Sequence, residues 1–172
     1  MHLNVEIKAT SNNSDYLRQW LLTNGADLKG TDHQTDTYYE VPNGRLKLRQ
    51  GNIENSLIFY ERNNQAGPKD SSVTMTKVDN GLQLNQVLEK ALGILVEVKK
   101  QREIYFIENV KFHVDHVPGL GNFIEIEAID KDGSIGKEKL LEQCNYYMQM
   151  LGIEEENLQT ASYSDMLMAK DR

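Results

Sequence analysis

Short runs in which charged and apolar residues alternate constrain the fold of this 172-residue chain more than any other feature. Successive side chains of a β-strand point to opposite faces, so the run 121–127 places Glu125 and Glu127 on one face and Ile124 and Ile126 on the other. The same alternation recurs in residues 4–8, 45–49, 98–102 and 112–115. Glycine- and asparagine-containing gaps separate these runs, as is typical of antiparallel hairpins. The chain therefore predicts several antiparallel strands, each with one charged and one apolar face.

The charges on these faces are sorted by sign. Arg45, Lys47 and Arg49 share one face, whereas Glu125 and Glu127 share another. Like charges side by side on an exposed strand do not stabilise one another, so a partner is expected. Two arrangements satisfy the pattern: an open sheet with a solvated charged face, or a barrel with a charged, water-filled lumen.

Helical periodicity is confined to four other segments. The first covers 15–24, where Ser14 offers an N-cap oxygen and Gly25 a left-handed stop. The others cover 84–92, 136–151 and 163–168, and Cys144 lies on the apolar stripe of the third. Cys144 is therefore expected in the core rather than in a reactive site.

Length and composition restrict the class of protein. A chain of 172 residues is most simply one domain, 1–172, and its one cysteine forms no internal disulfide. No segment resembles a signal peptide or approaches the roughly 20 apolar residues of a membrane span, which predicts a cytoplasmic protein without a membrane partner. The net charge of −7 argues against a general nucleic-acid binder but permits a local basic site.

The sorted charges indicate two kinds of ligand. A polyanion would neutralise the cations Lys8, Lys47, Arg49, Arg62, Lys100 and Arg102. A hard divalent cation such as magnesium or manganese, which prefers oxygen ligands, would neutralise the acids Glu6, Asp115, Glu125 and Glu127. A metal-bound triphosphate supplies both charges at once, and phosphoryl chemistry requires this combination.

A set of short motifs in fixed order extends over nearly the whole chain. They are Val5-Glu6-Ile7-Lys8, Gln34 to Tyr39, Gly44 to Arg49, Leu57 to Arg62, Ala66 to Lys69, Lys100-Gln101-Arg102, Asp115 with Leu120-Gly121, Phe123 to Glu127, and Ser162 to Leu167. In this order and spacing the chain resembles the CYTH superfamily of triphosphate tunnel enzymes, which includes class IV adenylyl cyclases and thiamine triphosphatases.

The resemblance implies an α+β fold, a closed eight-stranded antiparallel β-barrel flanked by helices, with a role for each matching residue. The candidate triphosphate-binding residues are Lys8, Arg45, Lys47, Arg49, Arg62, Lys69, Lys100 and Arg102. The candidate ligands of Mg²⁺ or Mn²⁺ are Glu6, Asp115, Glu125 and Glu127, and the candidate catalytic residues are Glu6, Lys8, Glu125 and Glu127.

The chain departs from the superfamily pattern at one position. The opening pattern Glu-x-Glu-x-Lys has Asn4 in place of its first glutamate. An amide oxygen still ligates a metal, but the lost negative charge is expected to weaken or rearrange cation binding.

Three functions fit these residues. The first is metal-dependent hydrolysis of an inorganic or organic triphosphate, and the second is class IV adenylyl cyclase chemistry, which converts ATP to cyclic AMP and pyrophosphate. The third is non-catalytic binding of nucleotide or polyphosphate, which leaves the acids without a purpose. The expected partner is a small-molecule triphosphate, and the protein is expected to act as a monomer or homodimer.

Overall fold

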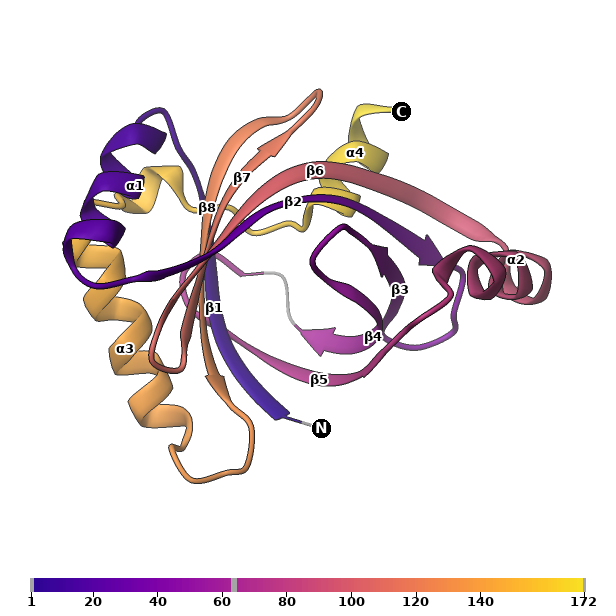
Figure 1. The fold of residues 1–172 in the computed structure, drawn as a ribbon, viewed down its shortest axis with the longest axis horizontal. Coiled ribbons are helices and arrows are strands. Elements are labelled where there is room, and N and C mark those ends of the chain that lie inside the picture. The colour runs from indigo at the N-terminus through magenta and orange to yellow at the C-terminus, as the bar shows by residue number, and fades with distance from the viewer. Residues whose placement is uncertain (1, 63–64, 172) are drawn as a thin grey trace.

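Eight antiparallel strands close into a barrel in the computed structural model, which describes residues 2–62 and 65–171, apart from the side chain of Arg62. The strands follow one another around the barrel in the order β1-β5-β4-β3-β2-β6-β7-β8 (Figure 1). Their bounds are β1 His2–Thr10, β2 Asp27–Tyr39, β3 Arg45–Gln50, β4 Asn55–Arg62, β5 Lys69–Lys77, β6 Ile94–Ile107, β7 Val110–Val117 and β8 Gly121–Asp130. The predicted closed eight-stranded barrel is confirmed, and the open sheet is excluded.

Four α-helices lie outside the barrel, where the sequence predicted them. They are α1 Ser14–Thr23, α2 Gly81–Leu92, α3 Lys137–Met150 and α4 Tyr163–Lys170, and a short 3₁₀ helix, η1 Glu155–Asn157, precedes α4. The prediction of Ser14 as N-cap is wrong: Asn13 occupies that position, and its side chain makes no capping hydrogen bond. The prediction for Gly25 is confirmed by its φ of 82°, which is a left-handed conformation. No helix in the described part of the chain is both long and apolar enough to cross a membrane.

The main hydrophobic core lies between the barrel and two helices, not inside the barrel. Helices α1 and α3 cover the outer faces of β1, β7 and β8 (Figure 1). Val5, Ile7, Phe112 and Ile126 from these strands are buried in this core, and so is Cys144 of α3, as predicted. Burying each large apolar side chain contributes about 1.5–3 kcal/mol, so this layer fixes which strand face points outward. The alternate, charged faces of β1, β7 and β8 therefore point into the barrel.

Candidate functional site

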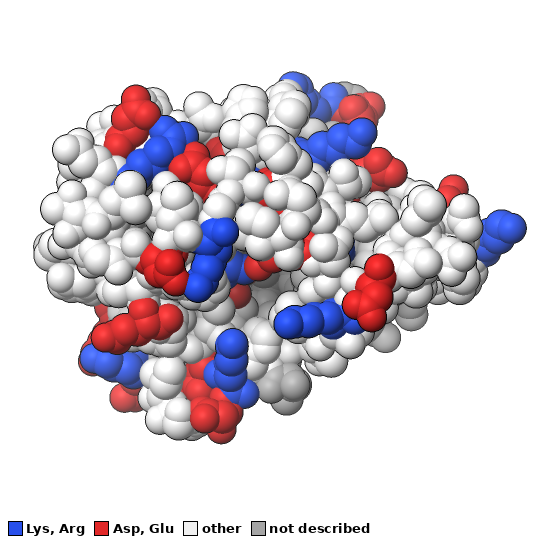
Figure 2. Space-filling model, in the orientation of Figure 1, with Lys and Arg blue, Asp and Glu red and all other residues white. Residues whose placement is uncertain are grey.

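A cavity of about 480 Å³ occupies the barrel and is lined by side chains from all eight strands. Figure 2 shows a recess near the centre of one face of the molecule, with basic and acidic side chains at its edge. The lining residues are those that alternate with the outward apolar positions, such as Asn4, Glu6 and Lys8 between Leu3, Val5 and Ile7. The alternation that predicts the strands therefore also determines what the cavity contains.

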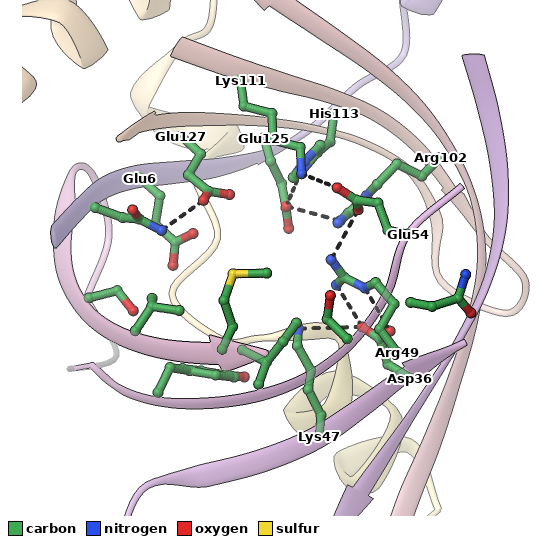
Figure 3. Close-up of a pocket in the computed structure, with 18 of the residues that line it drawn as sticks. Glu6, Asp36, Lys47, Arg49, Glu54, Arg102, Lys111, His113, Glu125 and Glu127 are labelled. Atoms are coloured by element: carbon green, nitrogen blue, oxygen red, sulfur yellow. Dashed lines mark hydrogen bonds and ion pairs between the residues drawn. The ribbon is translucent and has the colours of Figure 1, made fainter. Parts of the chain in front are cut away.

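One part of the cavity is a cluster of cations around a single carboxylate, Asp36. Asp36 on β2 lies directly opposite Arg49 on β3, and two hydrogen bonds of 2.9 and 2.8 Å join their side chains. The Nζ atom of Lys47 lies 3.3 Å from the same carboxylate (Figure 3). The Nζ atom of Lys100 lies 2.8 Å from it. Burial alone would raise the pKa of Asp36, but Arg49, Lys100 and Lys47 hold that pKa well below its ordinary value. Three cations facing one anion leave this part of the cavity net positive.

Next to this cluster, Arg102 is held by two acids. Its guanidinium forms a two-pronged pair with Asp115, its cross-strand neighbour, at 2.8 and 2.7 Å, and approaches Glu125 at 3.0 Å. Lys8 lies 3.6 Å from the other oxygen of Glu125. Burial opposes ionisation of Glu125, but Arg102 and Lys8 outweigh it and keep its pKa well below the ordinary value. Glu125 is therefore ionised and positioned at neutral pH.

Glu54 reaches the cavity from the loop between β3 and β4. The carboxylate of the buried Asp32 accepts hydrogen bonds from the backbone N–H groups of Asn52, Ile53 and Glu54, at 2.7, 3.0 and 2.9 Å. Glu54 Oε1 lies 3.4 Å from Arg49, and Oε2 pairs with Lys111 (Figure 3). Asp32 thus fixes the loop that places a further anion among the cations.

The opposite part of the cavity is acidic. Glu6 on β1 lies directly across from Glu127 on β8 (Figure 3). Asn4 Nδ2 donates a 2.7 Å hydrogen bond to Glu127 Oε1. Burial and the neighbouring carboxylates of Glu6 and Glu125 raise the pKa of Glu127 to about 6, although Lys111 opposes the shift. Proximity of two carboxylates is unfavourable without a cation between them.

Asn4 offers a further oxygen at this acidic end. Its Oδ1 is buried and has no hydrogen-bond partner among the described residues. A buried acceptor without a donor costs about 1–3 kcal/mol, and a hard cation would satisfy it. The oxygen donors of Asn4, Glu6 and Glu127 are therefore of the kind that a hard divalent cation prefers.

A second group of possible metal ligands lies beside Arg102. Ligand atoms of His113, Asp115 and Glu125 lie within 4.8 Å of one another. Burial, followed by the nearby charge of Arg102, lowers the pKa of His113 to about 4, so its ring is neutral at pH 7. Both oxygens of Asp115 are engaged by Arg102, and Tyr163 Oη donates a 2.7 Å hydrogen bond to one of them. Asp115 therefore orients Arg102 in this structure. It is not part of the acidic group formed by Glu6 and Glu127.

Most predicted site residues come together in the cavity, but Arg45, Lys69 and Asp115 do not line it. Arg45 points to α4, where it donates to Ser162 Oγ at 2.8 Å and pairs with Asp165 at 2.9 Å. Lys69 is buried, and its Nζ donates to the carbonyl of Thr160 at 3.1 Å. The side chain of Arg62 lies outside the described residues.

Other cavity residues were not predicted from the sequence. Asp36, Glu54, Lys111 and His113 all line the cavity, and α4 adds Tyr163. For Lys111 and His113 a signal existed, because both alternate with the buried Val110 and Phe112 on β7. Glu54 left no such signal, because loop residues have no periodicity.

The closed eight-stranded antiparallel barrel has the triphosphate tunnel fold. The chain belongs to the CYTH domain family, whose model matches residues 2–163. The tunnel enzymes of this family depend on metal, and acidic clusters of the kind described above suit one.

Similarity to individual proteins extends along the chain. A Methanocaldococcus jannaschii protein named as a candidate adenylate cyclase is 31% identical over 130 residues, which are 71% of this chain and 69% of the relative. The structure of the PH1012 protein of Pyrococcus horikoshii shares the fold with a TM-score of 0.80 and 24% identity, over 96% of this chain and 98% of that chain. A Hippeastrum protein, described as a candidate adenylyl cyclase with a dominant triphosphatase activity, has a TM-score of 0.65 and 13% identity over 99% and 96% of the two chains.

Proposed function

We propose that the protein is a divalent-metal-dependent phosphohydrolase that cleaves the terminal phosphate of a triphosphate bound along the tunnel. The observation that carries this proposal is the division of one cavity into a cationic part around Asp36 and an acidic part around Glu127. A bare polyanion would be repelled by Glu6 and Glu127, whereas a metal-bound triphosphate has a counter-charge for both parts.

The proposed roles follow from this division. Lys47, Arg49 and Lys100 bind phosphate oxygens, and Arg102 and Lys8 extend the cationic surface toward Glu125. When bound at Asn4, Glu6 and Glu127, Mg²⁺ or Mn²⁺ supplies Lewis-acid polarisation of the reacting phosphoryl group.

Glu125 is proposed to orient the water that attacks the phosphorus. Because its pKa is well below the ordinary value, Glu125 is a weak base at neutral pH and acts by accepting a hydrogen bond and orienting the water. Positioning and charge neutralisation supply most of the rate enhancement in phosphoryl transfer, so no covalent nucleophile is required.

A second candidate is adenylyl cyclase chemistry, which is favoured by the name of the Methanocaldococcus jannaschii relative. In that reaction the ribose 3′-hydroxyl of ATP attacks the α-phosphorus, and pyrophosphate leaves. The same cations would hold the polyphosphate, and only the phosphorus that faces the nucleophile differs. Non-catalytic binding is third, because a pure anion binder has no use for Glu6 and Glu127.

Phosphorus NMR separates the three functions in one experiment. The protein is incubated with ATP, tripolyphosphate or thiamine triphosphate, in the presence of Mg²⁺ or Mn²⁺. Release of inorganic phosphate supports the hydrolase, whereas pyrophosphate together with cyclic AMP supports the cyclase. Tight binding without turnover of any of these compounds would contradict both enzymatic functions.

A further inference from the structure

A buried histidine, His113, lies against the carboxylate that is proposed to orient the attacking water. His113 on β7 is the direct cross-strand neighbour of Glu125 on β8, so the register of the barrel brings the two side chains together. The Nδ1 atom of His113 is 2.9 Å from Glu125 Oε2 (Figure 3). The side chain of His113 is 3% exposed, whereas that of Glu125 is 14% exposed. His113 therefore contacts Glu125 from the wall of the cavity, and Glu125 is the more accessible of the two.

The two oxygens of Glu125 have different surroundings. Oε2 accepts a hydrogen bond from Arg102 at 3.0 Å and also contacts His113 Nδ1, so both of its lone pairs are engaged. Oε1 lies 3.6 Å from Lys8 Nζ, which is beyond hydrogen-bond length. The last torsion of a glutamate side chain is only weakly restricted, so the partners of the carboxylate decide which oxygen faces the lumen. Because Oε2 is engaged twice, Oε1 is the oxygen that can accept a hydrogen bond from water.

The contact with Glu125 fixes the position of the proton on the His113 ring. Glu125 lies between the cations of Arg102 and Lys8 and is therefore a carboxylate, which accepts hydrogen bonds but cannot donate one. His113 Nδ1 must be the donor, so the neutral ring carries its proton on Nδ1 and has a lone pair on Nε2. Nε2 is buried and has no hydrogen-bond partner among the described residues.

The unpaired Nε2 argues against a purely structural role for this histidine. A buried polar atom without a partner is destabilising, and an apolar side chain of similar size would avoid that cost. What an apolar side chain would lack is the hydrogen bond to Glu125. A lysine or arginine would supply that bond, but it would add a further positive charge beside Arg102 and Lys111, whose charges already act on His113. A neutral donor holds the carboxylate without this repulsion.

We infer that His113 is a positioning residue: its Nδ1–H group holds Glu125 Oε2, so that Oε1 is presented to the attacking water. This inference rests on the proposed function, in which Glu125 orients that water. Misorienting the water would slow the chemical step, whereas triphosphate binding depends on Lys47, Arg49 and Lys100. Loss of the His113 donor should therefore lower kcat and leave triphosphate affinity nearly unchanged.

Two substitutions separate the hydrogen bond from the bulk of the ring. His113→Leu has similar bulk but no donor, whereas His113→Asn keeps an N–H group at nearly the same distance from the backbone as Nδ1. The substrate is whichever of ATP, tripolyphosphate and thiamine triphosphate the wild type hydrolyses fastest with Mg²⁺. We expect kcat to fall about 10- to 100-fold in His113→Leu and to stay within about threefold of the wild type in His113→Asn. Affinity for the same triphosphate, measured by titration calorimetry in EDTA, should change less than about twofold in both variants.

The matched control is His116→Leu, on the same strand. His116 Nδ1 is 2.8 Å from the side chain of Asn122, its cross-strand neighbour on β8, but this pair does not line the cavity. The control should leave kcat and affinity unchanged. Nitrogen-15 NMR of the wild type supplies a measurement that is independent of turnover, because it distinguishes the two ring tautomers. The His113 ring is expected to carry its proton on Nδ1 at pH 7.

Three results would overturn the inference while leaving the proposed function intact. They are a His113 ring protonated on Nε2 alone, an unchanged kcat in His113→Leu, and equal losses of kcat in the Leu and Asn variants. Lower unfolding temperatures in both variants, together with equal losses of kcat, would identify the role of His113 as structural. Absence of turnover of all three triphosphates by the wild type would overturn the proposed function, and this inference with it.

Discussion

Asp36 is the residue on which the cationic part of the tunnel depends. It is 1% exposed and is shared by Arg49, Lys47 and Lys100, so it acts as an internal anion that holds three cations in place. Removing one partner of a buried ion pair costs about 3–5 kcal/mol, because the remaining charges stay buried without compensation.

The variant Asp36→Asn tests this role. We expect its free energy of unfolding to fall by about 3 kcal/mol without ligand and to recover more strongly than the wild type when tripolyphosphate is added. Urea denaturation with and without tripolyphosphate measures both effects. Asp27→Asn, which breaks an exposed pair with Lys29, is the control and should cost less than about 1 kcal/mol. Equal losses in the two variants would contradict the assigned role of Asp36.

Burial and the nearby carboxylates of Glu6 and Glu125 oppose the ionisation of Glu127. The pKa of Glu127 is raised to about 6 in the folded protein. The free energy of unfolding therefore falls as the pH rises from the ordinary glutamate pKa of 4.5 through 6, because Glu127 becomes ionised. Glu127→Gln should therefore leave the metal-free protein at pH 7 as stable as the wild type or more stable, by about 1–2 kcal/mol. The same change should reduce Mg²⁺-dependent turnover at least about 100-fold, since a metal ligand is lost.

Thermal unfolding with and without Mg²⁺, followed by a phosphate-release assay, measures both consequences. The control Glu97→Gln changes an exposed glutamate of β6 and should affect neither. Retained turnover in Glu127→Gln would rule out Glu127 as a metal ligand.

Lys100 gives the tunnel a pH dependence. Burial, together with the positive charges of Arg102, Arg49 and Lys47, lowers its pKa to about 7, although Asp36 opposes the shift. A bound polyanion raises that pKa, so binding takes up a proton, and affinity for tripolyphosphate should fall as pH rises above 7. Lys100→Arg keeps the charge at all these pH values and should show a smaller decline between pH 7 and 9 in calorimetric titrations. Identical pH profiles would contradict this assignment.

At the scale of elements, strand alternation predicts which face of a strand a residue occupies but not how deep in the tunnel it lies. Lys47 and Arg49 entered the cavity as expected, whereas Arg45, on the same face of β3, lies at the strand end beside α4. Glu54 could not be predicted because its position depends on Asp32 holding the loop, a contact between residues 22 apart. Asn4 was recognised as a departure, but only the pairing of β1 with β8 shows that it lies beside Glu127.

Arg45 illustrates the difference between face and depth. It holds the start of α4 through Ser162, Ser164 and Asp165, and the capping box of Ser162 with Asp165 reinforces that helix start. We expect Arg45→Ala to increase hydrogen exchange in residues 163–170 and to lower stability by about 1 kcal/mol, with tripolyphosphate affinity changed less than twofold. Lys47→Ala is the comparison and should weaken tripolyphosphate binding about tenfold. A similar loss of affinity in Arg45→Ala would contradict this role and would indicate that Arg45 binds the triphosphate.

At the scale of the whole molecule, the net charge of −7 gives no indication of the ligand. The basic side chains Lys8, Lys47, Arg49, Lys100 and Arg102 lie within the barrel, whereas acids such as Glu154, Glu155 and Glu156 lie outside the tunnel. Low-dielectric walls strengthen the field of enclosed charges, so the cations inside act on a ligand more strongly than the dispersed acids outside. An acidic protein can therefore contain a basic region inside its cavity.

The placement of the hydrophobic core has a mechanical consequence. Helices α1 and α3 support β1, β7 and β8 from outside, whereas β4 and β5, in the described residues, turn exposed side chains such as Ser72, Thr74 and Thr76 to solvent. The half of the barrel that carries Glu6, Glu125 and Glu127 is therefore supported by an apolar layer, whereas the described residues of β4 and β5 take no part in that layer. We therefore expect the supported half to stay rigid, because its charges must be placed to within fractions of an ångström. We expect β4 and β5 to deform more easily around ligands of different size.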